Sequence, residues 1–219
     1  MRNMQFGHNE YYHLCGRGLD RQTLFRDTGD FLRFLFLILY LQSPAQIHNI
    51  GSSVSAFLKH GSFGVTEERK IKLTKDKSLE LVSFALMPNH FHLLVRNVEE
   101  GAVSVYMHRT LMAYGKYFNT KYERFGHVFD GPFRSVHLKK NEQLLYTSSY
   151  IHKNPKSLPE FEHKYDEYPW SSYQDYTTQN RWPALLHTEI LLGQFKSQAN
   201  FRHFTETSVA KESELDLLI

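Results

Sequence analysis

The sequence predicts an α+β fold in which an antiparallel sheet is covered by packed helices. Short apolar runs indicate strands at Tyr11–Cys15, Leu79–Leu86, His90–Arg96 and Val136–Leu138. Pro88 and Asn89 indicate a turn or bulge between the second and third of these runs. Apolar residues spaced three and four apart indicate helices after the capping residues 27–30 up to about Leu41, from Ala102 to about Tyr122, and from Glu142 to about Lys153.

Other stretches carry weaker patterns. Helical spacing is expected at Ser53–His60 and, in the C-terminal tail, at Pro183–Phe195 and Ala199–Ser208. The polar and charged stretch Gly64–Lys77 is expected to form a hairpin or loop. Asn141 is the expected N-cap of the helix that ends before Pro155.

Composition limits the class of protein. With 219 residues, of which 41% are hydrophobic and 15% aromatic, the chain can bury one sizeable core. Cys15 is the only cysteine, which excludes an intramolecular disulfide and fits a reducing compartment. The first ten residues lack the apolar segment of a secretory signal, and the apolar stretch Phe31–Leu41 is too short to span a bilayer. We therefore expect a cytoplasmic protein with no membrane partner.

The net charge of +3 is uninformative, but its distribution is not. Residues 101–140 hold seven basic side chains against two acidic ones, and residues 156–219 hold six basic against ten acidic. A basic middle segment is compatible with a phosphate-binding face, although an ordinary solvated helix face explains the charge equally well.

His90 and His92 are the first candidates for chemistry. Side chains alternate between the two faces of a strand, so both imidazoles project from one face while Phe91 projects from the other. Two imidazoles so placed can bind one divalent transition metal. Two histidines in this spacing also occur without any function, and the pair alone does not decide between these interpretations.

The helix before Pro155 supplies the second half of a candidate site. Tyr150 and Asn154 are four residues apart and share one helix face. Tyr146 lies one turn earlier on that face. It can be a second nucleophile, a base-stacking residue or, more simply, a packing residue. Leu144, Ser148 and Ile151 lie on another face, which we expect to pack on the sheet.

Two motifs in this order resemble those of a known family. Met87–Val95, with the sequence Met-Pro-Asn-His-Phe-His-Leu-Leu-Val, closely resembles the histidine–hydrophobe–histidine motif of HUH single-tyrosine transposases, most of all the REP-associated tyrosine transposases. Tyr150–Pro155 is similar to the family's Tyr-Ile-His-x-Asn-Pro signature. The resemblance covers roughly residues 11–176. It departs from the family pattern at 130–132, where Asp-Gly-Pro replaces a frequent Gln-Gly-Arg, and at a probable insertion around 45–77.

The resemblance implies a ferredoxin-like antiparallel sheet with packed helices, the HUH endonuclease/transposase fold. It implies a catalytic domain at 1–157 and a helical C-terminal extension at 158–219 that packs on it. Tyr150 is the implied nucleophile, and the implied ligands of Mg²⁺ or Mn²⁺ are His90, His92 and Asn154. His13, in the first strand, can lie near the metal, but we expect a packed residue there. The expected DNA-binding residues are Arg17, Arg109, Lys116, Arg124, Arg134, Lys139 and His152.

The implied function is metal-dependent cleavage of single-stranded DNA and strand transfer through a 5′-phosphotyrosine intermediate. The expected partner is single-stranded DNA with hairpin or palindromic elements, bound by a monomer or a homodimer. Two alternatives stay open. One is a domesticated single-stranded or hairpin DNA-binding protein with little catalysis. The other is a metal-dependent phosphodiesterase in which His90 and His92 activate water and Tyr150 is structural.

Overall fold

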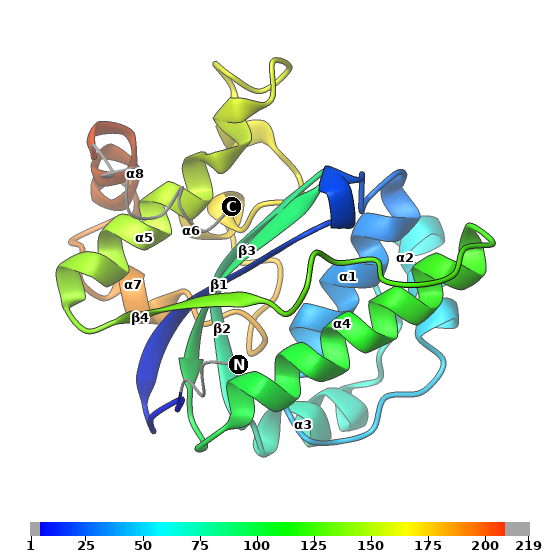
Figure 1. Ribbon diagram of the computed structural model, residues 1–219. Helices are drawn as coiled ribbons and strands as arrows, with labels where there is room; N and C mark the ends of the chain where they lie inside the picture. Colours follow the sequence, from blue (N-terminus) through cyan, green and yellow to red (C-terminus); the bar gives the residue numbers. More distant parts are fainter. Residues whose placement is uncertain (1–4, 209–219) are drawn as a thin grey trace.

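The sheet organises the fold and holds the histidine pair on an inner strand. In the computed structural model, which describes residues 5–208, four antiparallel strands lie in the order β2-β3-β1-β4. Their bounds are Glu10–Arg17 (β1), Leu79–Met87 (β2), His90–Asn97 (β3) and Arg134–Leu138 (β4). The predicted strands and the predicted α+β class are confirmed, and Figure 1 shows the strands crossing the centre of the molecule.

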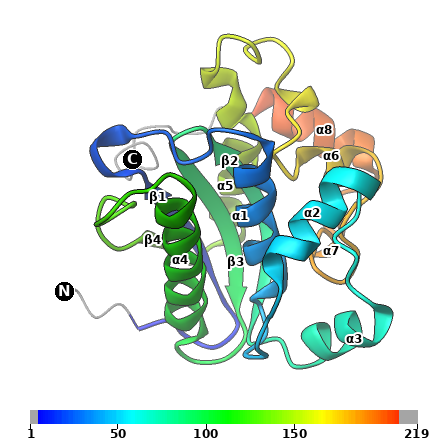
Figure 2. The same ribbon diagram turned by 90° about the vertical axis from the view of Figure 1, so that its right-hand side faces the viewer.

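Helices cover both faces of this sheet. α1 (Thr28–Tyr40) and α4 (Ala102–Lys121) cover one face, α2 (Ile50–His60) packs on α1, and α5 (Asn141–Lys153) covers the other face (Figures 1 and 2). The odd-numbered residues of β3 from Phe91 to Val95 belong to the core under α1 and α4, whereas Leu94 belongs to the core under α5. The inner strand is therefore buried on both sides, as its continuous apolar run predicted.

The α5 helix begins one turn after β4 and presents the expected face to the sheet. Leu144, Ser148 and Ile151 are buried. The N-cap is Lys140 instead of the predicted Asn141. The backbone N–H of Lys140 donates to the side-chain oxygen of Gln143 at 3.1 Å. The fold also contains three short 3₁₀ helices. The first, η1 (Leu19–Arg21), follows β1, the second, η2 (Asn154–Ser157), follows α5, and the third, η3 (Tyr165–Glu167), lies in the tail.

The segment 45–77 contains two helices, of which the sequence indicated one. The prediction of a hairpin or loop at 64–77 is wrong, because Glu67–Lys75 forms helix α3. Its start is capped by Thr66, whose hydroxyl oxygen accepts from the Arg69 N–H at 3.4 Å. Leu73 is its one buried residue, so the helix carries no apolar stripe that periodicity can detect.

The tail beyond residue 157 is bound to the edge strand β2. The backbone N–H of Leu86 donates to Trp170 O, and that of Ser172 donates to Phe84 O, each at 2.9 Å. The tail helices are α6 (Tyr173–Thr177), α7 (Glu189–Leu192) and α8 (Gln198–Thr207), and α8 packs on α5. The predicted helix at 183–195 is reduced to α7, because Ala184 has a φ of 64° and the backbone N–H of His187 donates to Leu81 O of β2 at 2.9 Å in place of a helical hydrogen bond.

Tail and sheet share one hydrophobic core. Tyr173 and Phe201 of the tail lie in the same cluster as Leu94 of β3 and Ile151 of α5. The boundary between two domains at residues 157/158 therefore stays a prediction, because the two parts are packed together in this core. Between residues 5 and 208 no helix is both long and apolar enough to cross a membrane.

Candidate active site

The first half of the site is the start of β3. The turn before it is held by the Pro88 carbonyl, which accepts from the backbone N–H groups of Leu24 and Phe25 at 2.8 and 3.0 Å. His90 and His92 then project toward α5, as strand alternation predicted, with ring centroids 5.1 Å apart. His92 is completely buried, whereas His90 retains some exposure.

The second half comes from the end of α5. The side-chain Oδ1 of Asn154 lies 3.1 Å from His90 Nε2, and its Nδ2 lies 3.3 Å from His92 Nε2. One amide thus contacts the Nε2 atoms of both histidines. The three predicted metal ligands meet at one point, although Asn154 follows the two histidines by more than sixty residues in sequence.

Tyr150 lies one helical turn before Asn154 and faces the same point. Its ring meets the His92 ring edge to face at a centroid distance of 5.4 Å and the His13 ring at 6.1 Å. Tyr150 is buried. Tyr146, in contrast, is exposed and contacts Phe204 of α8 at 5.7 Å, which supports its interpretation as a packing residue.

The outer nitrogen of each histidine has its own partner. His90 Nδ1 lies 2.8 Å from Asn89 Oδ1, and His92 Nδ1 lies 2.9 Å from His13 Nε2. If both Nδ1–H groups donate there, both Nε2 lone pairs point toward the Asn154 amide. The lone pair of His90 Nε2 then faces Asn154 Oδ1, an acceptor facing an acceptor, and a cation between them would satisfy both.

This arrangement fits a divalent metal. Metal-binding histidines commonly donate their second ring N–H to a neighbouring acceptor, as His90 and His92 can do here. Within residues 5–208 no cluster of three His, Cys, Asp or Glu side chains is suited to a metal, whereas the Asn154 amide oxygen lies 3.1 Å from His90 Nε2 and could serve as a third ligand. Oxygen and imidazole donors together suit Mg²⁺ and Mn²⁺, as well as the tighter-binding Zn²⁺.

The protonation state of the histidines also suits metal binding. Burial lowers the pKa of His90 to about 4; the neighbouring amide oxygen of Asn154, which favours a protonated imidazole, opposes this shift and the charge of Arg17 adds to it. Burial, together with the neighbouring His13 and His90, lowers the pKa of His92 well below its ordinary value. Both imidazoles are therefore neutral near pH 7, the form that binds metals.

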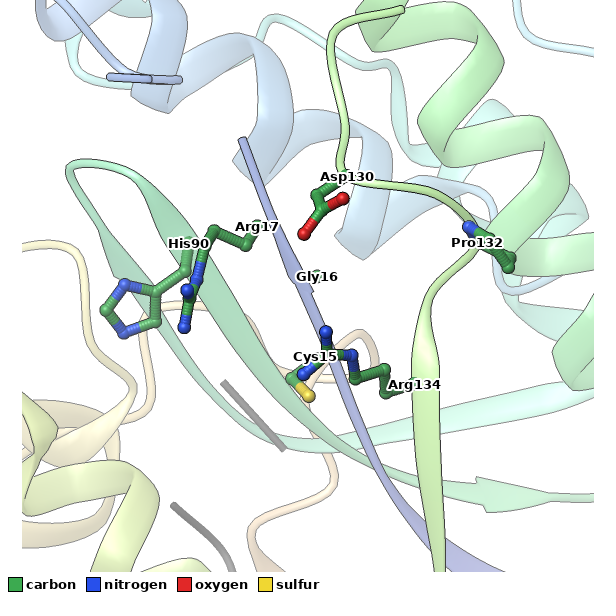
Figure 3. A pocket seen from close by; sticks show the side chains of 7 residues that line it. All are labelled: Cys15, Gly16, Arg17, His90, Asp130, Pro132 and Arg134. Carbon is green, nitrogen blue, oxygen red and sulfur yellow. The ribbon is translucent and has the colours of Figure 1, made fainter. Parts of the chain in front are cut away.

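A small pocket beside His90 holds two of the predicted DNA-binding residues. Figure 3 shows Arg17 of β1 beside the His90 ring and Arg134 of β4 reaching toward Cys15. Arg17 pairs with His90 in the β1–β3 register, and Arg134 pairs with Cys15 in the β1–β4 register. Burial and the charges of Arg21 and Arg134 lower the pKa of Arg17, whereas Asp130 opposes the shift. The pocket edge is therefore electropositive.

The other predicted DNA-binding residues lie away from this pocket. Lys116 and Lys139 are exposed on α4 and after β4. The Arg124 side chain donates to the side chain of Gln22. The guanidinium of Arg109 donates to the carbonyls of Ser43 and Ala45, each at 2.7 Å, so it ties α4 to the chain after α1.

His152 is a correction. It is completely buried, and its Nε2 lies 2.9 Å from the hydroxyl of Ser172 in the tail. Its ring packs against Tyr176 at 5.0 Å. The predicted contact with DNA is therefore wrong, because the tail covers the helix face on which His152 lies.

His13 is the residue that sequence reasoning undervalued. It is packed, as expected, with no exposed surface. The structure adds that its Nε2 contacts His92 Nδ1 directly. The sequence shows a histidine in the first strand, but it does not show that this strand pairs with the strand of His92. The contact can therefore be inferred only when the strand order is known.

Comparisons with known proteins show a similar family over part of the chain. The family described as "Transposase IS200 like" matches residues 65–154, which include both histidines of β3, Tyr150 and Asn154. No curated protein matches the chain.

A solved structure shares the fold. It is described as a REP-associated tyrosine transposase bound to a REP hairpin and has a TM-score of 0.53 at 12% sequence identity, covering 84% of this chain and 88% of that chain. Residues 65–154 are therefore similar to the IS200-like transposase family, and the chain shares the fold of a REP-associated tyrosine transposase, in agreement with the resemblance of its two motifs.

Proposed function

We propose that this protein cleaves and rejoins single-stranded DNA with Tyr150 as the nucleophile and a divalent metal as cofactor. The observation that carries the proposal is the position of Asn154. It contacts both His90 and His92 and lies one helical turn after Tyr150. This places a phenol beside a set of donors that fits a cation, at an electropositive pocket.

The proposed reaction is a transesterification. The Tyr150 hydroxyl oxygen attacks the phosphorus, a Tyr–O–P bond forms, and the bond from phosphorus to the 3′ oxygen breaks. The phenol proton is transferred overall to the departing 3′ oxygen, which leaves a 5′-phosphotyrosine and a free 3′-hydroxyl. Attack by another 3′-hydroxyl reverses these steps and joins strands without an external energy source.

The metal-binding residues would be His90, His92 and Asn154. A divalent ion bound there acts as a Lewis acid that polarises the phosphodiester, because a tyrosine hydroxyl with an ordinary pKa of about 10 is a weak nucleophile at neutral pH. We propose Mg²⁺ or Mn²⁺ as the working ion. Arg17 and Arg134 would hold the phosphate, since guanidinium groups bind phosphate oxygens in a fixed geometry.

The proposed substrate is single-stranded DNA beside a hairpin. Support comes from the solved structure of the same fold, whose description names a bound REP hairpin.

The test is the formation of a covalent adduct. A pool of single-stranded and hairpin DNA is incubated with the protein and Mn²⁺ or Mg²⁺, and denaturing gels detect DNA attached to protein. We expect a band in the wild type that disappears in Tyr150→Phe, in His90→Ala and after chelation of the metal. Tyr146→Phe is the matched control and is expected to keep the band, because Tyr146 packs on Phe204 one turn away.

The other outcomes decide between the two alternatives. DNA binding without an adduct on any hairpin substrate would contradict the proposal and favour a DNA-binding protein with little catalysis. Metal-dependent cleavage that persists in Tyr150→Phe would favour hydrolysis by activated water.

A further inference from the structure

His13 is a buried histidine at the site for which the proposed reaction has no role. It comes from β1 and lies outside the segment that the transposase family matches. Its side chain has no exposed surface, and its Nε2 lies 2.9 Å from His92 Nδ1. Its ring also contacts Tyr150 edge to face at 6.1 Å. One side chain thus contacts both a proposed metal ligand and the proposed nucleophile.

The direction of this hydrogen bond decides which nitrogen of His92 carries the proton. If His92 Nδ1–H donates to His13 Nε2, the Nε2 lone pair of His92 is available and accepts from Asn154 Nδ2 at 3.3 Å. In the reverse direction His92 carries its proton on Nε2, which then faces the Asn154 NH₂ group, a donor facing a donor. The orientation of the Asn154 amide therefore agrees with His13 as the acceptor.

The remaining nitrogen of His13 makes this assignment specific. His13 Nδ1 is buried and has no hydrogen-bond partner among residues 5–208. Buried polar atoms without a partner are uncommon and destabilising in folded proteins. The His13 side chain therefore reaches His92 through its other ring nitrogen, Nε2, and packing needs alone would be met by an apolar side chain.

We propose that His13 is a positioning residue that holds His92 with its proton on Nδ1 and its Nε2 lone pair directed at the metal site. The inference rests on the proposed function, because it assigns His13 a role toward the metal that His90, His92 and Asn154 would bind. His13 acts through His92 and does not itself bind the ion.

The first readout needs no metal. Long-range ¹H–¹⁵N NMR of the metal-free wild-type protein reports which ring nitrogen of His92 is protonated, and we expect Nδ1. In His13→Gln an amide oxygen can accept the same hydrogen bond, so we expect the same tautomer. In His13→Met no acceptor is present, and we expect the Nδ1–H form to give way to a mixture with the Nε2–H form.

The second readout is the affinity for Mn²⁺, measured by titration calorimetry. We expect His13→Met to weaken binding by roughly ten- to a hundredfold, the usual effect of losing such an outer hydrogen bond. His13→Gln is expected to stay within a few-fold of the wild type. His152→Met is the matched control, because it also removes a completely buried imidazole, one whose hydrogen bond is with Ser172 of the tail.

The outcomes separate this inference from the proposed function. A wild type whose His92 carries its proton on Nε2 would overturn the inference, and this measurement is possible even if His13→Met does not fold. Equal Mn²⁺ affinities of wild type and His13→Met would overturn it as well. A wild type with the expected tautomer but no Mn²⁺ binding would instead contradict the metal-dependent function and leave the hydrogen bond itself supported.

Discussion

Asn154 at the end of α5 lies 3.1 Å from His90 at the start of β3, although 64 residues separate them in the chain. Two features bring them together. The apolar face of α5, including Ile151, packs on the sheet, and Pro155 ends the helix beside the first residues of β3. A ligand from a helix end and two ligands from a strand start thus meet at one rim of the sheet.

Asn154 is expected to be a metal ligand whose oxygen is essential. Asn154→Ala removes that oxygen, and we expect the affinity for Mn²⁺ to fall more than about tenfold. Asn154→Asp keeps an oxygen donor of the kind that Mg²⁺ and Mn²⁺ prefer, so we expect its affinity for Mn²⁺ to stay within a few-fold of the wild type. Calorimetric titration measures both affinities. Asn119→Ala serves as the control, because it removes an amide that donates to Gly126 O, away from the site. Unchanged Mn²⁺ binding in Asn154→Ala would exclude Asn154 from the ligand set.

Arg17 and Arg109 are expected to differ in their effect on DNA binding. Arg17→Ala removes a cation beside His90, so we expect weaker binding of single-stranded DNA and a salt dependence (log affinity against log salt) that is shallower by about 0.7. Arg109→Ala removes two hydrogen bonds to carbonyls and is expected to lower the free energy of unfolding by about 1–3 kcal/mol without changing that slope. Fluorescence titrations at several salt concentrations and urea unfolding measure the two effects. A shallower slope in Arg109→Ala would instead support its predicted role in DNA binding.

Asp30 is expected to be the main polar anchor between α1 and α4. Its carboxylate is completely buried and accepts from Lys121 Nζ at 2.7 Å and from the hydroxyl of Tyr117 at 2.8 Å. Asp30→Ala removes the acceptor of the Tyr117 hydroxyl and leaves Lys121 with Asp27 alone, so we expect a loss of about 3–5 kcal/mol in the free energy of unfolding. Asp27→Ala, at the N-cap of α1, is the comparison and should cost about 1 kcal/mol. Equal losses in urea unfolding would contradict the anchoring role of Asp30.

The stability of the metal-free protein is expected to fall when the pH is lowered. Burial lowers the pKa of His13 and of His90 to about 4 and that of His152 to about 3. In the unfolded chain these histidines have a pKa of about 6.5, so below that pH the unfolded state binds more protons than the folded state. The free energy of unfolding then decreases by up to about 1.4 kcal/mol per pH unit for each histidine.

Urea unfolding between about pH 7 and about pH 5 measures this slope, in a range above the usual pKa of carboxylates. His152→Phe removes one of the titrating groups and is expected to reduce the slope by the share of one histidine. A free energy of unfolding that does not change over this range would show that these imidazoles are not held neutral by the fold.

Local patterns in the sequence predicted the elements that carry the proposed chemistry. Alternation placed His90 and His92 on one strand face, and a spacing of four placed Tyr150 and Asn154 on one helix face. Both inferences need only the geometry of a single element, which neighbouring residues determine. The same reasoning failed for α3, whose exposed polar helix has no apolar stripe, and for the helix predicted at 183–195, which Ala184 interrupts.

The sequence by itself determined the α+β class, the strand and helix that hold the candidate site, and the residue types that meet there. The tertiary structure alone decided which residues contact one another across elements. His13 became a neighbour of His92 because β1 pairs with β3, and His152 became a core residue because the tail covers α5. The physical reason is that burial and partners depend on what packs against a face, and that information lies in segments far away in the chain.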